Sequence, residues 1–155
     1  MAERGDPAFR VLSDGGGMSL YGIIDEHADL SFFERLHGTT RINLRGVRRI
    51  NSYGVRSWIE AVRRVPANAD VELVECPPSV VDQMNMVAGF VGRAQVISFY
   101  APMACERCGH EKEALFSVAD YQLAGQLPAV PCPKCAAPMQ VDDLEDHYLL
   151  FAREP

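Results

Sequence analysis

The segment RINLRGVRRINSYGVRSWIEAVRRV, residues 41–65, decides the fold, because it passes from a strand pattern to a helix pattern within a few residues. Ile42 and Leu44 alternate with polar residues, as the inward-facing positions of a half-buried strand do. From Ser52 onward, apolar residues recur at helical spacing and form one apolar face. That face consists of Val55, Trp58, Ile59, Val62 and Val65. We therefore expect a strand followed directly by an amphipathic helix that begins at Ser52 and ends before Pro66.

The rest of the first hundred residues alternates in the same way between strand patterns and short helix patterns. The turn SDGGG, residues 13–17, separates two apolar segments and favours a hairpin, because glycine adopts positive φ freely. Single short helices between the later strands imply crossover connections between parallel neighbours. We therefore expect an α/β fold, a mixed β-sheet covered by helices, with the order ββαβαβαβ. The expected strands are 9–12, 18–24, 40–47, 70–76 and 94–100, and the expected helices are 29–38, 52–65 and 79–87.

The composition is that of a soluble globular protein, with 48 % apolar and 23 % charged residues in a chain of 155. No apolar run approaches the roughly 20 residues that span a bilayer. The first ten residues, MAERGDPAFR, are charged and precede no apolar core, unlike a secretory signal. We therefore expect a cytoplasmic protein with no membrane partner.

Charge is distributed unevenly along the chain, whose net charge is −6. Residues 1–100 carry 11 bases and 12 acids, whereas residues 101–155 carry 4 bases and 9 acids, a net of −5. Seven arginines between 41 and 64 are interrupted by one acid, Glu60. They are either a solvated surface or a docking face for an acidic partner or a phosphate. The seven are Arg41, Arg45, Arg48, Arg49, Arg56, Arg63 and Arg64.

Four of the five cysteines form two Cys-x2-Cys pairs, Cys105 with Cys108 and Cys132 with Cys135, separated by 23 residues. Each pair places two thiolates on one tight turn, and Gly109 gives the first turn room. Two such turns complete a tetrahedron around Zn²⁺, with Zn–S distances of about 2.3 Å. Four thiolates leave no open coordination position, so the sequence predicts a structural zinc rather than a catalytic one.

Other uses of these cysteines fit less well. A redox motif needs only one pair, and an iron–sulfur cluster is compatible with four thiolates but less typical of two symmetric turns. His110 is either a substitute ligand, a neighbour of the ligands, or an exposed side chain. Cys76, at the end of an expected strand, is interpreted as a buried core thiol.

A change in the sequence pattern near residue 101 predicts two domains. Residues 1–100 carry the alternating α/β pattern, and residues 101–155 carry the cysteine pairs and few long apolar runs. Leu144, Tyr148 and Phe151 are helically spaced and predict a C-terminal helix. The second domain is therefore expected to be a small zinc ribbon with a C-terminal helix, whose metal supplies much of its folding energy.

The stretches LYGIIDEHADLSFFERL and RINLRGVRRINSYGVRSWIEAV resemble a STAS domain, the family of the bacterial anti-sigma-factor antagonists and of the cytoplasmic ends of sulfate transporters. The resemblance covers residues 8–100 and rests on Gly22 and Asp25, on the following strand, and on NSYGV at the helix start. The antagonists read Asp-Ser-small-Gly there, and a partner kinase that is also the anti-sigma factor phosphorylates the serine. By position, Asn51 replaces the aspartate, Ser52 matches the phosphoacceptor, and the bulky Tyr53 departs from the pattern.

The resemblance implies a non-catalytic protein-interaction module in bacterial cytoplasmic signalling, which docks a kinase-like or other signalling protein. The expected partner-binding residues are Asn51, Ser52, Tyr53, Gly54 and Arg56. Considered by itself, Ser52 is expected to be the N-cap of the helix, and phosphorylation would add a second role there.

Two other classes of function are weighed against this one. A zinc-ribbon protein that binds nucleic acid or regulates transcription is the alternative, although a net charge of −5 disfavours direct phosphate contact. An enzyme is not expected, since the sequence has no nucleophile–base pair, Walker loop or open metal site. Binding of a nucleotide or anion, and self-association into a homodimer, are left open.

Overall fold

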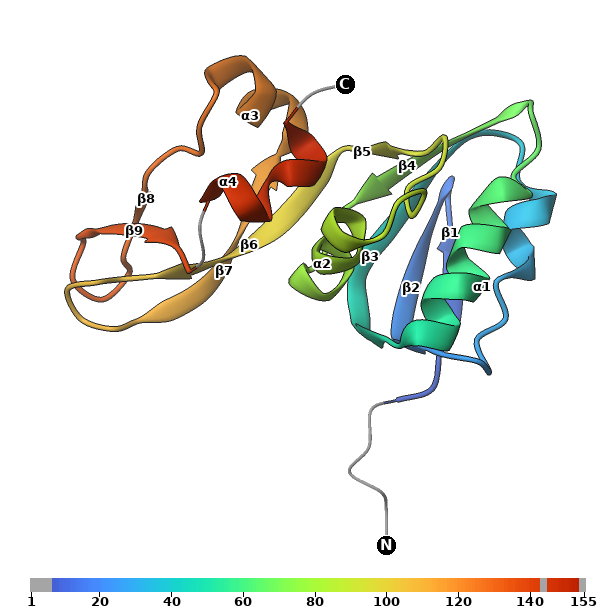
Figure 1. Cartoon of the computed structure of the whole chain (residues 1–155), viewed down its shortest axis with the longest axis horizontal. Coiled ribbons are helices and arrows are strands. Elements are labelled where there is room, and N and C mark those ends of the chain that lie inside the picture. The colour runs from blue at the N-terminus through green and yellow to red at the C-terminus, as the bar shows by residue number, and fades with distance from the viewer. Residues whose placement is uncertain (1–6, 143–144, 154–155) are drawn as a thin grey trace, which may run out of the picture.

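The computed structural model describes residues 7–142 and 145–153, and Figure 1 shows its two halves side by side. One half is built on a five-stranded sheet with the order β1-β2-β3-β4-β5, and the other on a four-stranded sheet with the order β7-β6-β9-β8. The predicted α/β class and mixed sheet are confirmed.

The five-stranded sheet combines one antiparallel pair with three parallel ones. β1 and β2 form the hairpin that the SDGGG turn predicted, and β2–β3, β3–β4 and β4–β5 are parallel. The connections between the parallel strands contain the helices η1, α1 and α2. The strands are β1 Arg10–Asp14, β2 Gly17–Ile24, β3 Gly38–Ile50, β4 Ala69–Val74 and β5 Gln95–Val96.

The helices η1 (Ser31–Arg35), α1 (Ser52–Arg63) and α2 (Pro78–Met86) supply the other side of this core, and Figure 1 shows α1 and α2 in front of the same sheet. Trp58 is the centre of the packing: its ring contacts Phe33 edge-on at 5.3 Å and stacks on Phe90 at 5.4 Å. The indole Nε1 donates to the Phe90 carbonyl at 2.9 Å, so the buried ring leaves no polar atom unpaired.

The second half begins at β6, which follows β5 and lies beside the residues that come directly after β4. Cys76 N–H donates to the Ser98 carbonyl at 3.1 Å, and Tyr100 N–H donates to the Cys76 carbonyl at 2.8 Å. Strand β6 thereby joins the two sheets and crosses residue 101, so the division of the chain at 100/101 stays a prediction. The elements of this half are β6 Ser98–Ala104, β7 Glu111–Ser117, α3 Val118–Ala124, β8 Val130–Pro131, β9 Pro138–Val141, α4 Glu145–Tyr148 and η2 Leu150–Ala152.

Four expected elements differ from the observed ones. The strand expected at 94–100 is divided between β5, Gln95–Val96, and β6, Ser98–Ala104, which belong to different sheets. The helix expected at 29–38 is a single 3₁₀ turn, η1, and the strand expected at 40–47 runs from 38 to 50. The C-terminal helix is short: α4 ends at Tyr148, Phe151 lies in η2, and Leu144 is outside the described residues. Among the residues that the structure describes, no helix has the length and apolar character to cross a membrane.

Candidate metal centre and the start of helix α1

The two cysteine pairs lie on two turns with the same backbone hydrogen bonds. In each turn the first cysteine donates its N–H to the carbonyl five residues later and accepts from the N–H four residues later. The first turn joins β6 to β7, and the second joins β8 to β9. The bonds are Cys105 to His110 (2.9 Å), Gly109 to Cys105 (2.8 Å), Cys132 to Ala137 (2.8 Å) and Ala136 to Cys132 (2.8 Å).

The fifth residue of each turn has a left-handed backbone. Gly109 has φ +81°, and Ala136, its counterpart, has φ +67° although it carries a Cβ. Glycine adopts this conformation without cost, whereas alanine loses about 1 kcal/mol in it. The second turn therefore holds its shape against a local backbone preference.

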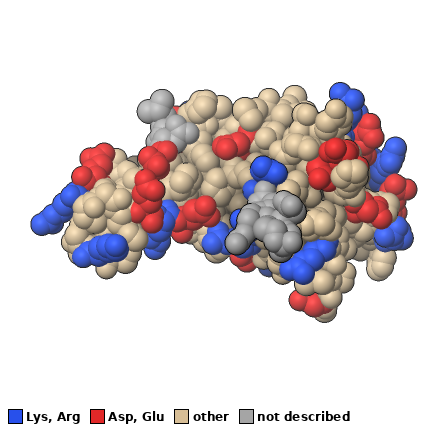
Figure 2. All heavy atoms as spheres, turned by 90° about the horizontal axis from the view of Figure 1, so that it is seen from below, with Lys and Arg blue, Asp and Glu red and all other residues tan. Residues whose placement is uncertain are grey.

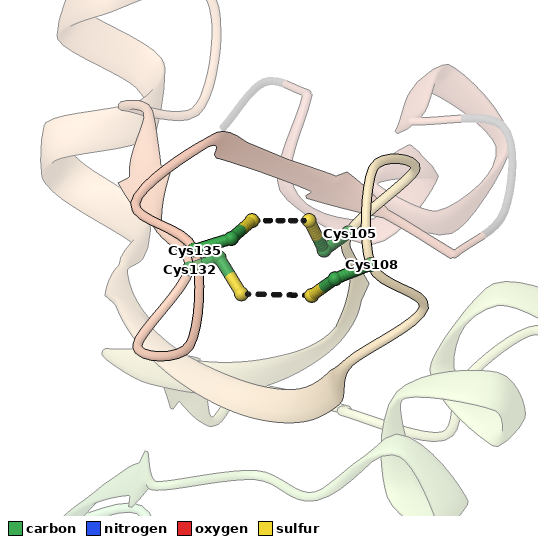
Figure 3. Close-up of side chains that lie close together, drawn as sticks. All are labelled: Cys105, Cys108, Cys132 and Cys135. Carbon is green, nitrogen blue, oxygen red and sulfur yellow. Dashed lines mark hydrogen bonds between the residues drawn. The ribbon is translucent and has the colours of Figure 1, made fainter.

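The four sulfur atoms converge between the turns (Figure 3). Sγ of Cys105 lies 3.5 Å from Sγ of Cys135, Sγ of Cys108 lies 3.5 Å from Sγ of Cys132, and all four lie within 4.8 Å of one another. A tetrahedron with Zn–S bonds of about 2.3 Å separates its sulfurs by about 3.8 Å. The four cysteines could therefore hold one metal ion, and the distances suit zinc.

The surroundings of two of the sulfurs, those of Cys105 and Cys132, favour thiolates. The N–H groups of Cys108 and Arg107 lower the pKa of Cys105 to about 6. At Cys132 burial works the other way, but hydrogen bonds from the N–H groups of Lys134 and Cys135 leave the pKa lowered. His110 contributes its backbone groups, and its side chain is not one of the four grouped ligands.

At Cys108 the balance is reversed. The N–H of His110 favours the thiolate, but the neighbouring sulfur of Cys132, together with burial, raises the pKa to about 11. Cys108 is exposed, whereas Cys105 and Cys132 are buried. Arg107 and Lys134, one in each turn, are exposed cations beside the cluster. Four thiolates and one Zn²⁺ would carry a net charge of −2, which these cations partly balance.

The start of α1 is capped by Asn51 and not by Ser52. Asn51 has an extended backbone, its Oδ1 accepts from the N–H of Gly54 at 2.8 Å, and its Nδ2 donates to Glu26 Oε1 at 3.3 Å. The expectation that Ser52 is the N-cap was wrong. Ser52 is the first residue inside the helix, and its exposed hydroxyl makes no hydrogen bond with another described residue.

Gly54 has a packing role at the same place. It is buried, and a Cβ atom there would lie inside the contact distance of the Ile24 carbonyl oxygen at the end of β2. Asn51 N–H also donates to this carbonyl, at 3.2 Å. The glycine of NSYGV is thus required for the close approach of α1 to the sheet.

The structure brings the other predicted partner-binding residues to the surface of the first helical turns. Ser52, Tyr53 and Arg56 are exposed, and the Tyr53 side chain is 61 % accessible. The tip of α1, defined here as residues 51–56, therefore offers a hydroxyl, a phenol ring and a guanidinium to solvent. Gly54 is the only predicted contact residue in it that is buried.

At least three of the seven arginines between 41 and 64 pair with a carboxylate. Arg41 pairs with Glu72 at 3.1 Å, Arg45 with Glu113 at 3.0 Å, and Arg64 with Glu34 at 3.6 Å. Figure 2 shows basic and acidic groups interspersed on the face of the molecule seen from below. These pairs agree with a solvated surface at the three positions, and a docking face formed by the other arginines stays a prediction.

Sequence reasoning missed a polar network on the face of the sheet away from the helices. Glu75 has φ +54°, and its carboxylate accepts from Asn43 Nδ2 at 2.9 Å and from the Tyr100 hydroxyl at 3.3 Å. The Arg45 guanidinium lies over the Tyr100 ring, 3.7 Å from its centre. No motif marks these residues, because the partners lie far apart in the chain, from 25 positions for Glu75 and Tyr100 to 55 for Arg45 and Tyr100.

Comparison with known proteins found no matching family model, no matching curated protein and no matching solved structure.

Proposed function

We propose that this chain is a non-catalytic protein-interaction module of bacterial cytoplasmic signalling, a STAS-like platform that docks a partner through the tip of α1. The observation that carries the proposal is that Asn51, and not Ser52, caps the helix. Because Asn51 caps the helix, the exposed Ser52 hydroxyl is not used by the fold. It is therefore accessible to a kinase as a phosphoacceptor.

The side chains beside Ser52 are suited to a protein partner. Tyrosine and arginine dominate the binding energy of many interfaces, and Tyr53 and Arg56 are both exposed. The N-terminus of α1 carries a positive partial charge. An acidic or polar partner surface fits this combination. A phosphate on Ser52 would make the tip of α1 negatively charged, and the tip would then repel an acidic partner.

The arrangement around the tip agrees with what the STAS resemblance implies. The helix start follows directly from β3, beside the end of β2, and Gly54 seats the helix against the Ile24 carbonyl. Asn51 stands where the family has aspartate and performs a capping role that aspartate also performs. The bulky Tyr53, which departs from the family pattern, points to a different partner surface from that of the sigma-factor antagonists.

The second half serves this platform as a structural zinc ribbon. Its four sulfurs close the coordination sphere of the metal, which leaves no site for water or substrate. The ribbon is joined to the platform through β6 and extends its surface.

The experiment is capture of the partner from the native host with wild-type protein and with Ser52→Ala, Ser52→Asp and Tyr53→Ala. The captured protein is identified by mass spectrometry and rebound in purified form. We expect Ser52→Ala to bind, Ser52→Asp and Tyr53→Ala to bind at least tenfold more weakly, and Ser52 phosphate to appear on peptide mapping. Ser57→Asp, on the same helix, is the matched charge control. Equal binding by all four variants would remove the tip of α1 as the docking site.

A nucleic-acid-binding ribbon is the second candidate, and one observation favours it: Arg107, Lys112 and Lys134 are all exposed near the cysteine turns. In that case, binding to single- or double-stranded oligonucleotides weakens with added salt, and Lys134→Glu weakens it further. The Ser52 variants would then bind as the wild type does.

A further inference from the structure

A cleft of about 470 Å³ lies between the turn of the β1–β2 hairpin and the link from η1 to β3. It opens at the end of the five-stranded sheet opposite the tip of α1, as the positions of β1 and α1 in Figure 1 show. Strand β2 runs from Gly17 in the cleft wall to Ile24 beside α1, and a strand of this length spans about 23 Å. The cleft is therefore separate from the proposed docking site.

Hydrogen-bond donors predominate among the polar side chains that line the cleft. The lining residues include three with hydroxyl groups, one arginine, one histidine and one acid, Asp14. Arg35 donates a long hydrogen bond of 3.5 Å to the Ser31 carbonyl, and its charge helps to lower the pKa of Asp29, whereas the other donor side chains have no hydrogen bond within the described part of the chain. The donors are Ser13, Arg35, His37, Thr39 and Thr40.

The glycines of the hairpin turn leave their backbone open to the cleft. Gly15 and Gly16 have φ of +29° and +121°, and a Cβ atom at either position would meet no atom within 4 Å. Open space therefore adjoins the α-carbons of both glycines. Successive turn N–H groups with glycine between them commonly form concave anion sites.

We propose that this cleft binds the phosphate group of a small phosphorylated ligand. Two segments, 13–18 and 35–40, bring together hydrogen-bond donors of three kinds, and charge-assisted bonds from arginine to phosphate are the strongest that such a set can make. The volume lies in the range of about 300–1,000 Å³ that small-molecule sites occupy, so the cleft has room for more than the phosphate itself.

A positively charged ligand fits the residues that line the cleft poorly. A cation would find one carboxylate, Asp14, opposite the fixed positive charge of Arg35. The negative charge of Asp14 should weaken the binding of an anion. Removal of this charge should therefore strengthen phosphate binding if the proposal is correct.

The test is titration of the ¹⁵N-labelled full chain, followed by amide chemical shifts, with inorganic phosphate, glycerol 3-phosphate and glycerol at constant ionic strength. We expect saturable shifts at Gly15, Gly16, Thr39 and Thr40 with both phosphates and none with glycerol. Tighter binding of glycerol 3-phosphate than of inorganic phosphate would identify an organic phosphate as the ligand, and the reverse order would identify the free ion.

Three variants and one control complete the test. Arg35→Gln is expected to weaken phosphate binding about tenfold or more, because it removes a charge-assisted bond. Thr40→Val is expected to weaken it less, and Asp14→Asn to strengthen it. Arg63→Gln, an exposed arginine of α1, is expected to bind as the wild type does. Shifts that do not saturate, that appear equally with glycerol, or that weaken as much in Arg63→Gln as in Arg35→Gln would overturn the proposal.

Discussion

Asn85 and Tyr148, one in α2 and the other in α4, are joined by a hydrogen bond of 2.8 Å from Asn85 Nδ2 to the Tyr148 carbonyl. The same amide accepts from the N–H of Phe151 at 2.9 Å, so both polar atoms of Asn85 are used. The Tyr148 hydroxyl continues to the Tyr100 carbonyl in β6 at 2.6 Å. The segment that follows the second cysteine turn thus returns to the α/β half, where hydrogen bonds from both side-chain and backbone groups hold it.

Replacement of Asn85 by alanine should release this segment. The substitution removes the hydrogen bond to the Tyr148 carbonyl and the acceptor of the Phe151 N–H, and the expected loss is about 1–3 kcal/mol of unfolding free energy. Urea denaturation measures the loss, and hydrogen exchange should show faster exchange at residues 149–152. Met86→Ala, at the next position and 71 % exposed, is the control and should cost much less. Equal stability of the two variants would show that the Asn85 bonds contribute nothing to the fold.

Metal content is the most direct test of the four-cysteine cluster. Elemental analysis of purified protein should give one zinc per chain. Cys105→Ser should lose the metal, because three thiolates hold zinc less tightly than four. Since metal binding supplies folding energy to a small module, chelation should raise the hydrogen-exchange rates of the turns around residues 105–110 and 132–137.

Lys134→Ala is the control for this substitution, because it lies in the second turn but is not a ligand. It should keep its zinc. Protein that contains no metal, or that shows Cys105–Cys135 and Cys108–Cys132 disulfides when purified under reducing conditions, would contradict a zinc site.

The paired turns allow a prediction of opposite signs at equivalent positions. Ala136→Gly should stabilise the zinc-loaded protein by about 1 kcal/mol, because φ +67° is unfavourable for alanine. Gly109→Ala should destabilise it by about the same amount. A Cβ at Gly109 meets no atom within 4 Å, so only backbone strain contributes. Thermal unfolding of both variants measures the difference, and a loss of stability in Ala136→Gly would refute this account of the turns.

The sequence predicted the features whose physics is local. Each cysteine turn is closed by hydrogen bonds within six residues, so a Cys-x2-Cys pair in the sequence is enough to predict such a turn. The helix at α1 follows from the spacing of its apolar residues, and Trp58 and Val62 are buried as that spacing predicts. Such features need no knowledge of the rest of the chain.

The features that were missed depend on distant partners. Strand β3 buries Leu44 and Val47, three positions apart, because the register between β2 and β3 shifts beside Gly46. That shift breaks the alternation from which the strand was recognised, and the strand was expected to end too early. A Cβ at Gly46 would overlap the Tyr21 ring, a contact that only the paired strands reveal.

The cap of α1 was assigned wrongly for a different reason. Asparagine and serine are equally good N-caps, so composition does not choose between neighbouring Asn51 and Ser52. The choice depends on where the chain leaves β3 and on the carbonyl of Ile24, which receives the Asn51 N–H. Propensity placed the helix start to within one residue, and the sheet decided which residue caps it.

The buried thiol of Cys76 should react more slowly than the other cysteines of the chain. Burial raises the pKa of Cys76 far above the ordinary thiol value, so the folded protein holds it as a neutral thiol, which is a poor nucleophile. Because the raised pKa belongs to the folded state, its stabilising effect is complete below the unfolded pKa of about 8.5. It is lost as pH rises further, since the unfolded thiol ionises first.

Alkylation at pH 8, followed by mass spectrometry, measures this reactivity. After chelation, the four cysteines of the turns should be modified first, and Cys76 should be modified only when denaturant is added. Cys105, whose pKa is lowered to about 6, is the internal reference for a reactive thiol. Labelling of Cys76 at the rate of Cys105 would show that the core around Cys76 opens in the native state.

The start of α1 gives the last prediction, in which three adjacent substitutions should have three different effects on stability. Asn51→Ala should cost about 1 kcal/mol, because it removes the cap on the Gly54 N–H. Ser52→Ala should change stability by less than about 0.5 kcal/mol, since the hydroxyl has no partner among the described residues.

Gly54→Ala should cost about 2 kcal/mol or more, because the added methyl group can be accommodated only if α1 moves away from the Ile24 carbonyl. Urea denaturation of the three variants and of Ser57→Ala, a control one turn further along, tests the order. If Ser52→Ala were as costly as Asn51→Ala, the serine would be a structural cap after all. Its hydroxyl would then no longer be uncommitted, and the proposal that Ser52 is a regulated contact would lose its main support.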